Sequence, residues 1–294
     1  MRLAPAALLL ALAAPALAQD AEDDRRPPLF LVEDADSRVY LLGSVHALPP
    51  DALPLPAHVE AAYAEAETVA FELDLDEATA GAPAMLAAGT DEETVAEALS
   101  PEQRAAFDAR LGEIGLPPGA LDAFEPWLAA LTYGVLAIEQ AGASTDGGVD
   151  EHLFRRAQAD GKALAAFETL ELQTAAFDGL PVEAQVALLM ESVEDDRDPA
   201  DVFSQMVDAW ATGDDEGLAE MMNEGMGNPA VFEALLAGRN RAWVPQVEAL
   251  LARDGEDALV VVGAGHLVGR ESVVELLREA GHEVVRIDEV RSGD

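Results

Sequence analysis

The sequence of 294 residues contains no cysteine and a single lysine, Lys162, and each shortage excludes a class of chemistry. Without cysteine there can be no disulfides, thiolate metal sites or cysteine nucleophiles. Basic residues are scarce: the chain has 17 Lys and Arg but 57 Asp and Glu. Its formal net charge is therefore −40. Such a charge repels nucleic acid and anionic lipid, so no nucleic-acid partner is expected. The carboxylates are spread along the whole chain, which favours a solvated acidic surface over a functional acidic tract.

Long apolar runs are also missing, apart from a short one at the N-terminus. Arg2 precedes an uncharged apolar segment, residues 6–14, and Ala16-Leu17-Ala18 forms a small-x-small cleavage site. The apolar segment is too short to span a bilayer. We therefore predict a signal peptide over residues 1–18, cleaved after Ala18, and an exported, periplasmic protein without a transmembrane segment.

The remaining chain is long enough, and at 50% hydrophobic residues apolar enough, to form a sizeable core. Residues 19–28 are charged and end in two prolines, so we predict a flexible mature N-terminus there. Residues 29–290 are predicted to form a single domain with a helical insertion at about 91–253. The fold class is predicted to be α/β, with α+β variants open: a β-containing core from both chain ends with a long helical middle.

Apolar, β-branched runs between turn-forming residues predict the strands, and helical periodicity predicts the helices. A β-hairpin is predicted from residues 29–32 and 38–45. The other predicted strands are 68–75, 163–167, 258–262 and 283–287. The predicted helical segments are 56–67, 91–141 (broken at 115–119), 147–160, 170–253 (with several breaks) and 271–280.

Two copies of one short pattern, Gly-x-x-His, are the main functional signal. Gly43 to His46 and Gly263 to His266 each follow a predicted strand, so each strand ends in a glycine turn that presents an imidazole. Ligands gather at the carboxyl ends of strands in α/β folds. Two such ends brought together would form a site. The alternative is that both histidines only bind nearby backbone groups.

Neutral imidazole is a common ligand of transition metals, and a catalytic zinc-type site uses about three N or O ligands and one open position. His46 and His266 could supply two of them. Glu72 is a candidate for the third, because an inward carboxylate between Phe71 and Leu73 must be paired, metal-bound or exposed.

Other polar residues extend the candidate site. If the strand 68–75 is correct, Glu72, Asp74 and Asp76 share one face of it, and the alternative is an exposed acidic face. Glu168 closes another apolar run. Arg239 and Asn240 open the helix before the last strands, and Arg239 could balance Glu72 or Glu168.

A weaker motif competes with this interpretation. Gly263-x-Gly265-x-x-x-Gly269 after a strand, with Asp288 at the end of the next strand, is similar to a dinucleotide fingerprint. Too few residues follow Asp288 for the rest of such a fold, and export removes the protein from the nicotinamide pool. The other histidines, His58, His152 and His282, lack the glycine context and are predicted to lie on helix or turn surfaces.

In these motifs the chain resembles the TraB/GumN family, which is related to the Tiki proteases and to erythromycin-esterase-like proteins. The resemblance runs from one end of the mature chain to the other, and residues 174–236 match only loosely. One departure is Ser44, where threonine is usual. The matching stretches are VYLLGSVHALP (39–49), VAFELDL (69–75), residues 148–173, AGRNRAW (237–243) and residues 260–287.

The resemblance implies an α/β core of two β-containing halves joined by helices. Tiki members resemble metal-dependent peptidases that use manganese- or cobalt-type ions, and the wider superfamily includes haem-binding proteins. His46, Glu72, His266 and Arg239 fall on the family's motif positions.

The sequence and this resemblance favour a periplasmic metal-dependent hydrolase with a peptide or small-molecule substrate. His46, His266 and Glu72 would hold a divalent ion of the Mn, Co or Zn type, and Glu72 with Arg239 would act in catalysis. Two classes stay open: a non-catalytic metal- or haem-binding protein, and an interaction or regulatory factor of the cell envelope. The further candidate site residues are Gly43, Gly263, Glu168 and Asn240.

Overall fold

A computed structural model describes residues 23–47, 53–90, 92–140, 147–195 and 197–289. The predicted signal peptide, residues 1–18, and the first four residues of the predicted mature N-terminus lie outside this part. Among the helices of the described ranges, none combines the length and the apolar character that a membrane span requires.

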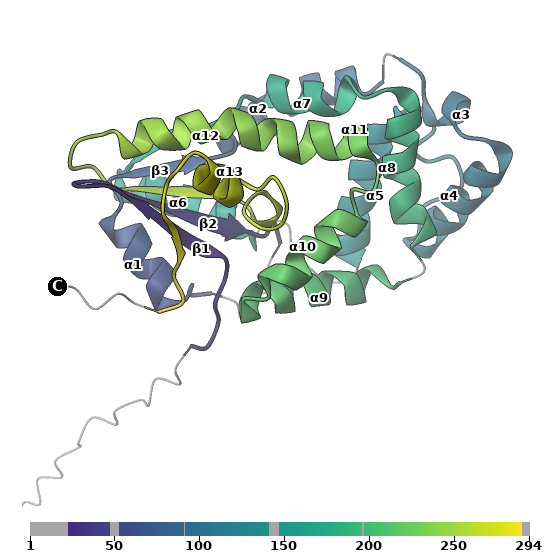
Figure 1. Ribbon diagram of the computed structural model, residues 1–294. Helices are drawn as coiled ribbons and strands as arrows, with labels where there is room; N and C mark the ends of the chain where they lie inside the picture. Colours follow the sequence, from purple (N-terminus) through teal and green to yellow (C-terminus); the bar gives the residue numbers. More distant parts are fainter. Residues whose placement is uncertain (1–22, 48–52, 91, 141–146, 196, 290–294) are drawn as a thin grey trace, which may run out of the picture.

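The described strands form one mixed sheet in the order β4-β3-β5-β2-β1-β6 (Figure 1). Neighbouring strands from β4 to β2 are parallel, whereas β1 pairs antiparallel with both β2 and β6. The predicted hairpin and α/β fold class are therefore confirmed. The strands are β1 (Leu29–Glu33), β2 (Arg38–Ser44), β3 (Thr68–Phe71), β4 (Ala163–Ala166), β5 (Ala258–Gly263) and β6 (Val284–Arg286).

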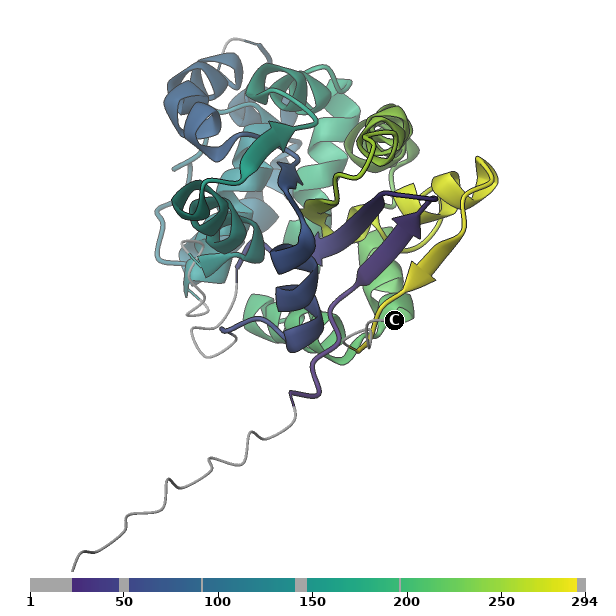
Figure 2. The same cartoon turned by 90° about the vertical axis from the view of Figure 1, so that its left-hand side faces the viewer.

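Both faces of the sheet are covered, which explains why its strands are almost continuously apolar. Successive residues of a strand point to opposite faces: Leu29 belongs to one core cluster and Phe30 to the other. Helices α1 (Ala57–Glu65) and α6 (Val149–Asp160) cover the first face, and α12 (Gly238–Leu251) and α13 (Val273–Glu279) cover the second. Figure 2 shows α1 and α12 on opposite sides of the sheet.

The helical middle of the chain lies beside the carboxyl ends of the parallel strands and has a core of its own, around Leu111, Tyr133 and Leu189. Short helical turns Glu233–Ala237 and Ala264–His266 precede α12 and follow β5. The other helices are α2 (Leu75–Ala88), α3 (Val95–Ala98), α4 (Pro101–Glu113), α5 (Pro126–Gln140), α7 (Leu170–Asp178), α8 (Val182–Glu194), α9 (Pro199–Thr212), α10 (Asp215–Glu224) and α11 (Pro229–Phe232).

One predicted strand is wrong in its second half. Strand β3 ends at Phe71, and the Asp74 carboxylate accepts hydrogen bonds from the backbone N–H groups of Asp76 and Glu77, which caps the start of α2. Helix capping by aspartate therefore overrides the alternating pattern. Glu72, Asp74 and Asp76 do not share the face of a strand.

The surface position predicted for His58 is also wrong. Its residue is only 6% exposed, because α1 turns this side chain inwards. Among the residues that the structure describes, none makes a hydrogen bond with its buried Nε2 atom.

Candidate functional site

Four parallel strands each deliver one polar side chain to the same edge of the sheet. Glu72 directly follows β3, Glu168 follows β4 by two residues, His46 follows β2 by two residues and His266 follows β5 by three. The strand order places them in the sequence Glu168, Glu72, His266, His46 along this edge. We call these four residues the strand-end cluster. Its position is the one where α/β sheets collect ligands.

The two Gly-x-x-His motifs meet because glycine lets their backbones approach closely. Ser44 and Gly263 are register partners in the parallel β2–β5 pair. A Cβ atom at Gly43 would lie 3.0 Å from the Cα atom of Ala264, closer than ordinary contact allows.

The space over Gly263 is the centre of the cluster. A Cβ atom there would lie 3.2 Å from Glu72 Oε1, 3.6 Å from His266 Cδ2 and 4.0 Å from His46 Nε2. Both histidines and Glu72 therefore surround one backbone position, so the two motif ends, whose meeting the sequence left open, lie together.

Arg239, in the first turn of α12, ties the carboxylates together. Its Nη2 atom donates to Glu72 Oε2 at 2.8 Å and to Glu168 Oε2 at 2.9 Å, and its Nε atom donates to Glu168 Oε1 at 3.0 Å. The three side chains are only 10–14% exposed. Arg239 was predicted to pair with Glu72 or Glu168, and in the structure it pairs with both.

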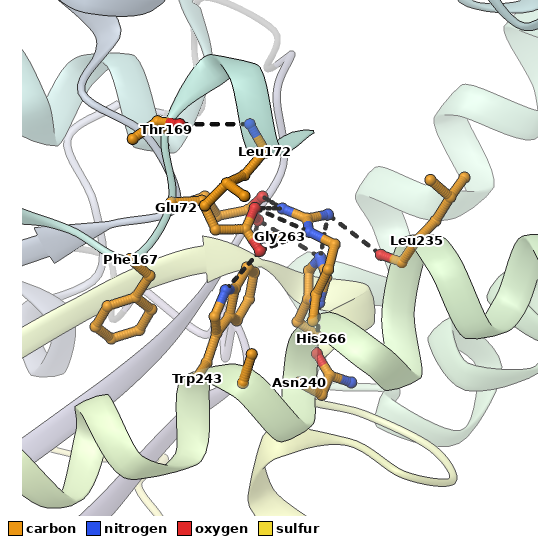
Figure 3. Close-up of polar contacts among 12 residues, drawn as sticks. Glu72, Phe167, Thr169, Leu172, Leu235, Asn240, Trp243, Gly263 and His266 are labelled. Atoms are coloured by element: carbon orange, nitrogen blue, oxygen red, sulfur yellow. Dashed lines mark hydrogen bonds and ion pairs between the residues drawn. The ribbon is translucent and has the colours of Figure 1, made fainter. Parts of the chain in front are cut away.

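Trp243 completes this network, and its role in the site was not predicted from the sequence. It lies one helical turn after Arg239, its Nε1–H donates to Glu168 Oε1 at 2.8 Å, and its ring centroid lies 4.3 Å from that of His266 (Figure 3). The four-residue spacing from Arg239 is the signal that could have revealed it.

Asn240 orients His266. Its Nδ2 atom donates to the Glu271 carbonyl at 2.8 Å, which leaves Oδ1 to accept a hydrogen bond from Nδ1 of His266 at 2.6 Å. This tautomer leaves Nε2 with a lone pair, and Nη1 of Arg239 lies 3.3 Å from it. Burial lowers the pKa of His266 to about 4, so the ring is neutral at neutral pH.

Asp150 orients His46 as Asn240 orients His266, and this role was not predicted from the sequence either. It lies in the first turn of α6, and its Oδ2 atom is 3.1 Å from His46 Nδ1. The His46 side chain is 73% exposed, so this contact rather than burial governs its charge. The hydrogen bond to Asp150 raises the pKa of His46 to about 9. The signal in the sequence was an acidic residue two positions after the Gly147-Gly148 pair.

Glu72 stays ionised in spite of its burial. Burial raises its pKa, but the interactions with His266, Arg239 and His46 outweigh this effect, and the net pKa is about 2. Its Oε1 atom also accepts the backbone N–H of Gly263 at 2.7 Å. The cluster and Arg239 therefore combine carboxylates, a fixed cation and two imidazoles of different charge.

His46, Glu72 and His266 of the cluster, together with Arg239, line the floor of a cavity with a volume of about 320 Å³. A second cavity of about 250 Å³ shares His46 and Glu72 with it. The remaining histidines lie elsewhere: His282, for example, contacts Glu248 on the far part of α12.

An α/β sheet that gathers two Gly-x-x-His turns, a glutamate and an arginine at its strand ends defines a distinct class of protein, and comparison with known proteins identifies it. The model of the TraB/PrgY/gumN family matches residues 28–286. The chain belongs to this family, as its motifs predict.

Two relatives show how far the similarity extends. The chain is 24% identical over 255 residues to the uncharacterized protein YbaP of Escherichia coli K12, which covers 86% of this chain and 92% of YbaP. The YbaP protein of Shigella flexneri matches equally well, at 24% identity over 255 residues. The family match covers the whole sheet and site, and the names of the relatives assign no reaction.

Proposed function

We propose that the protein is an exported hydrolase that cleaves a peptide-like carbonyl substrate at the strand-end cluster. The observation that carries this proposal is the convergence of His46, His266 and Glu72 on the space over Gly263, at the floor of a cavity. Convergent titratable groups with displaced pKa values are typical of catalytic sites.

A divalent ion of the manganese, cobalt or zinc type is the proposed cofactor, held by Nε2 of His46, Nε2 of His266 and the Glu72 carboxylate. The donor chemistry supports it, because Asp150 and Asn240 engage the Nδ1 atoms and direct both Nε2 atoms inwards. Such an ion supplies Lewis-acid polarisation of a carbonyl group and a more acidic water.

The side-chain arrangement is not yet that of a closed metal shell. Within the described ranges, no three His, Cys, Asp or Glu side chains are placed so that they could hold a metal ion as they stand. Arg239 accounts for this at His266, because its Nη1 atom lies against the Nε2 lone pair. Loading would require Arg239 to give up this contact and His46, whose pKa is about 9, to release its Nε2 proton.

The residues of the chain have definable roles in hydrolysis. Glu72 is anionic and would accept the proton of the attacking water, which requires hydrogen-bond reach through one water. Arg239 would stabilise the oxyanion or orient Glu72. Glu168 and Trp243 hold the Arg239 guanidinium group in place.

The Arg239–His266 contact favours a second candidate, in which the same residues hydrolyse the substrate without a metal ion. The guanidinium group then provides the positive charge of the site, and neutral His266 accepts a proton at Nε2 once Nη1 of Arg239 has turned to the substrate. This candidate and the first differ in one measurable respect, the metal content of the active protein.

Export is part of the proposal and rests on the N-terminal sequence. Arg2, the apolar segment 6–14 and Ala16-Leu17-Ala18 have the order of a signal peptide. N-terminal sequencing of the protein from a periplasmic fraction should start at Gln19. Recovery of the uncleaved chain from the cytoplasm would contradict it.

The decisive experiment compares three proteins: wild type, the His46→Ala/His266→Ala double variant, and a His152→Ala/His282→Ala control that removes as many histidines away from the cluster. Metal content and titration with manganese, cobalt and zinc are measured at high salt, which suppresses loose binding by the acidic surface. Hydrolysis of a peptide library is measured in parallel.

The proposed cofactor predicts one tight site that is lost only in the His46/His266 variant, together with the loss of hydrolysis. Hydrolysis without a tight site selects the metal-free candidate. A tight metal ion or a haem Soret band without any hydrolysis would instead identify a binding protein. If the double variant hydrolyses peptides as well as wild type, the strand-end cluster is not the active site.

A further inference from the structure

The cavity above the strand-end cluster has a polar floor and apolar walls. The floor consists of His46, Glu72 and His266 of the cluster, together with Arg239. The walls come from the middle part of the chain. Apart from Gln173 and Thr174, their side chains are thioether, aliphatic or aromatic. The apolar residues that line the cavity are Met85, Leu131, Phe177, Met222, Met226, Leu235 and Leu236.

Two of these wall residues, Met222 and Phe177, are held in place by close packing. Gly265 follows the second motif glycine, and a Cβ atom there would lie 2.9 Å from Met222 Cε, so the missing side chain lets α10 approach the His266 turn. Phe177 stacks on Trp127 with ring centroids 5.8 Å apart and an angle of 25° between the planes.

Methionine is the most adaptable of the apolar side chains, because it is unbranched and polarisable. Three of the seven methionines of the chain, Met85, Met222 and Met226, line this one cavity. A wall of this kind accepts large apolar groups of different shapes. The net charge of −40 acts against acidic ligands at the same entrance.

We propose that this chamber binds the large aliphatic or aromatic side chain of a peptide next to the bond that the cluster attacks. We call it the methionine-walled chamber; its specificity-determining residues are Met85, Phe177, Met222 and Met226. The volume of about 320 Å³ suits one large side chain with part of its backbone. The inference rests on the proposed function for the reaction, but side-chain binding can be measured without any turnover.

The test uses the methionines themselves as reporters. The protein is labelled with ¹³C at the methionine ε-methyl groups and titrated with blocked pentapeptides acetyl-Gly-Gly-Xaa-Gly-Gly-amide, where Xaa is Leu, Phe, Ser or Asp. The methyl signals of Met85, Met222 and Met226 should shift with the Leu and Phe peptides. Met190 and Met206 serve as internal controls, because Met190 lies in the helical core and Met206 lines a separate cavity.

We expect the Leu and Phe peptides to bind at least about tenfold more tightly than the Ser peptide, the preference that burial of one large apolar side chain provides. The Asp peptide should bind most weakly. Met222→Gln should remove most of this preference, whereas Met221→Gln, at the neighbouring residue of the same helix, should retain it, because Met221 faces a different surface hollow.

The wild-type titration needs no variant, so a variant that fails to fold does not affect the result. Equal responses to Leu and Ser, or equal shifts at the control methionines, would overturn the inference. Selective binding without hydrolysis would support the proposed side-chain binding and refute the proposed hydrolase activity. Hydrolysis with no preference for Xaa would refute the proposed side-chain binding and leave the proposed hydrolase activity standing.

Discussion

Arg239 and Glu168 form a two-pronged ion pair, in which Nε lies 3.0 Å from Oε1 and Nη2 lies 2.9 Å from Oε2. The same Nη2 atom reaches Glu72, so one guanidinium group pairs with two largely buried carboxylates. Only the planar, five-donor group of arginine can do this, and lysine would serve as a single point charge. The site is therefore arranged around Arg239 before any substrate arrives.

Replacing Arg239 should be severe. In Arg239→Met two carboxylates that are 10–14% exposed lose their cation, and we expect unfolding free energy to fall by about 3–5 kcal/mol in urea titrations. Arg241→Met is the matched control, since Arg241 is 44% exposed and pairs with Glu233 and Glu271 at the surface; it should cost about 0–1 kcal/mol. Equal losses in both variants would contradict the assigned role.

The close approach of the two motifs depends on Gly43. In Gly43→Ala the new methyl group would lie 3.0 Å from Ala264 Cα, and we expect a loss of about 1–3 kcal/mol in thermal or urea unfolding. Gly134→Ala is the control, because α5 leaves open space around that position and alanine should stabilise the helix by about 1 kcal/mol. A neutral Gly43→Ala variant would show that the motifs can separate freely.

Asp150 should control the charge of His46. In Asp150→Asn the negative partner is gone, so the pKa of His46 should fall from about 9 towards its ordinary value of about 6.5. The measurement is an NMR titration of the His46 ring, assigned by the loss of its signal in His46→Ala. Asp160→Asn, which alters the same helix at its far end beside Tyr63, should leave the titration unchanged. An unchanged pKa in Asp150→Asn would refute the pairing.

Buried His58 should make stability depend on pH. Burial lowers its pKa in the folded protein, so protons bind more strongly to the unfolded chain. The contribution of neutral His58 to the free energy of unfolding is then complete above about pH 6.5 and is lost as the pH falls below that value. His58→Leu should reduce the drop in urea midpoint between pH 7.5 and 5.5, whereas His282→Leu, at the surface beside Glu248, should not. The same drop in all three proteins would exclude His58 as the cause.

Several parts of the structure could be predicted from local patterns. The hairpin of β1 and β2 follows from two apolar runs around a polar turn, and the second motif follows a strand as expected. The error at Asp74 has a local cause too, because a single carboxylate that caps α2 outweighs two alternating positions. His58 was misplaced because its neighbours on α1 do not show which face of the helix meets the sheet.

The sequence by itself determined which groups stand at the ends of the strands: two imidazoles after glycine turns, Glu72 and Glu168 after apolar runs, and Arg239 early in a helix. These are local facts, because strand and turn preferences act over a few residues. Only the tertiary structure decided that Arg239 binds both glutamates, that Asp150 and Trp243 join the site, and that helices from the middle of the chain close it with methionines. Those contacts join residues up to 167 positions apart, and their energy depends on burial and on the order of strands in the sheet, which no local pattern encodes.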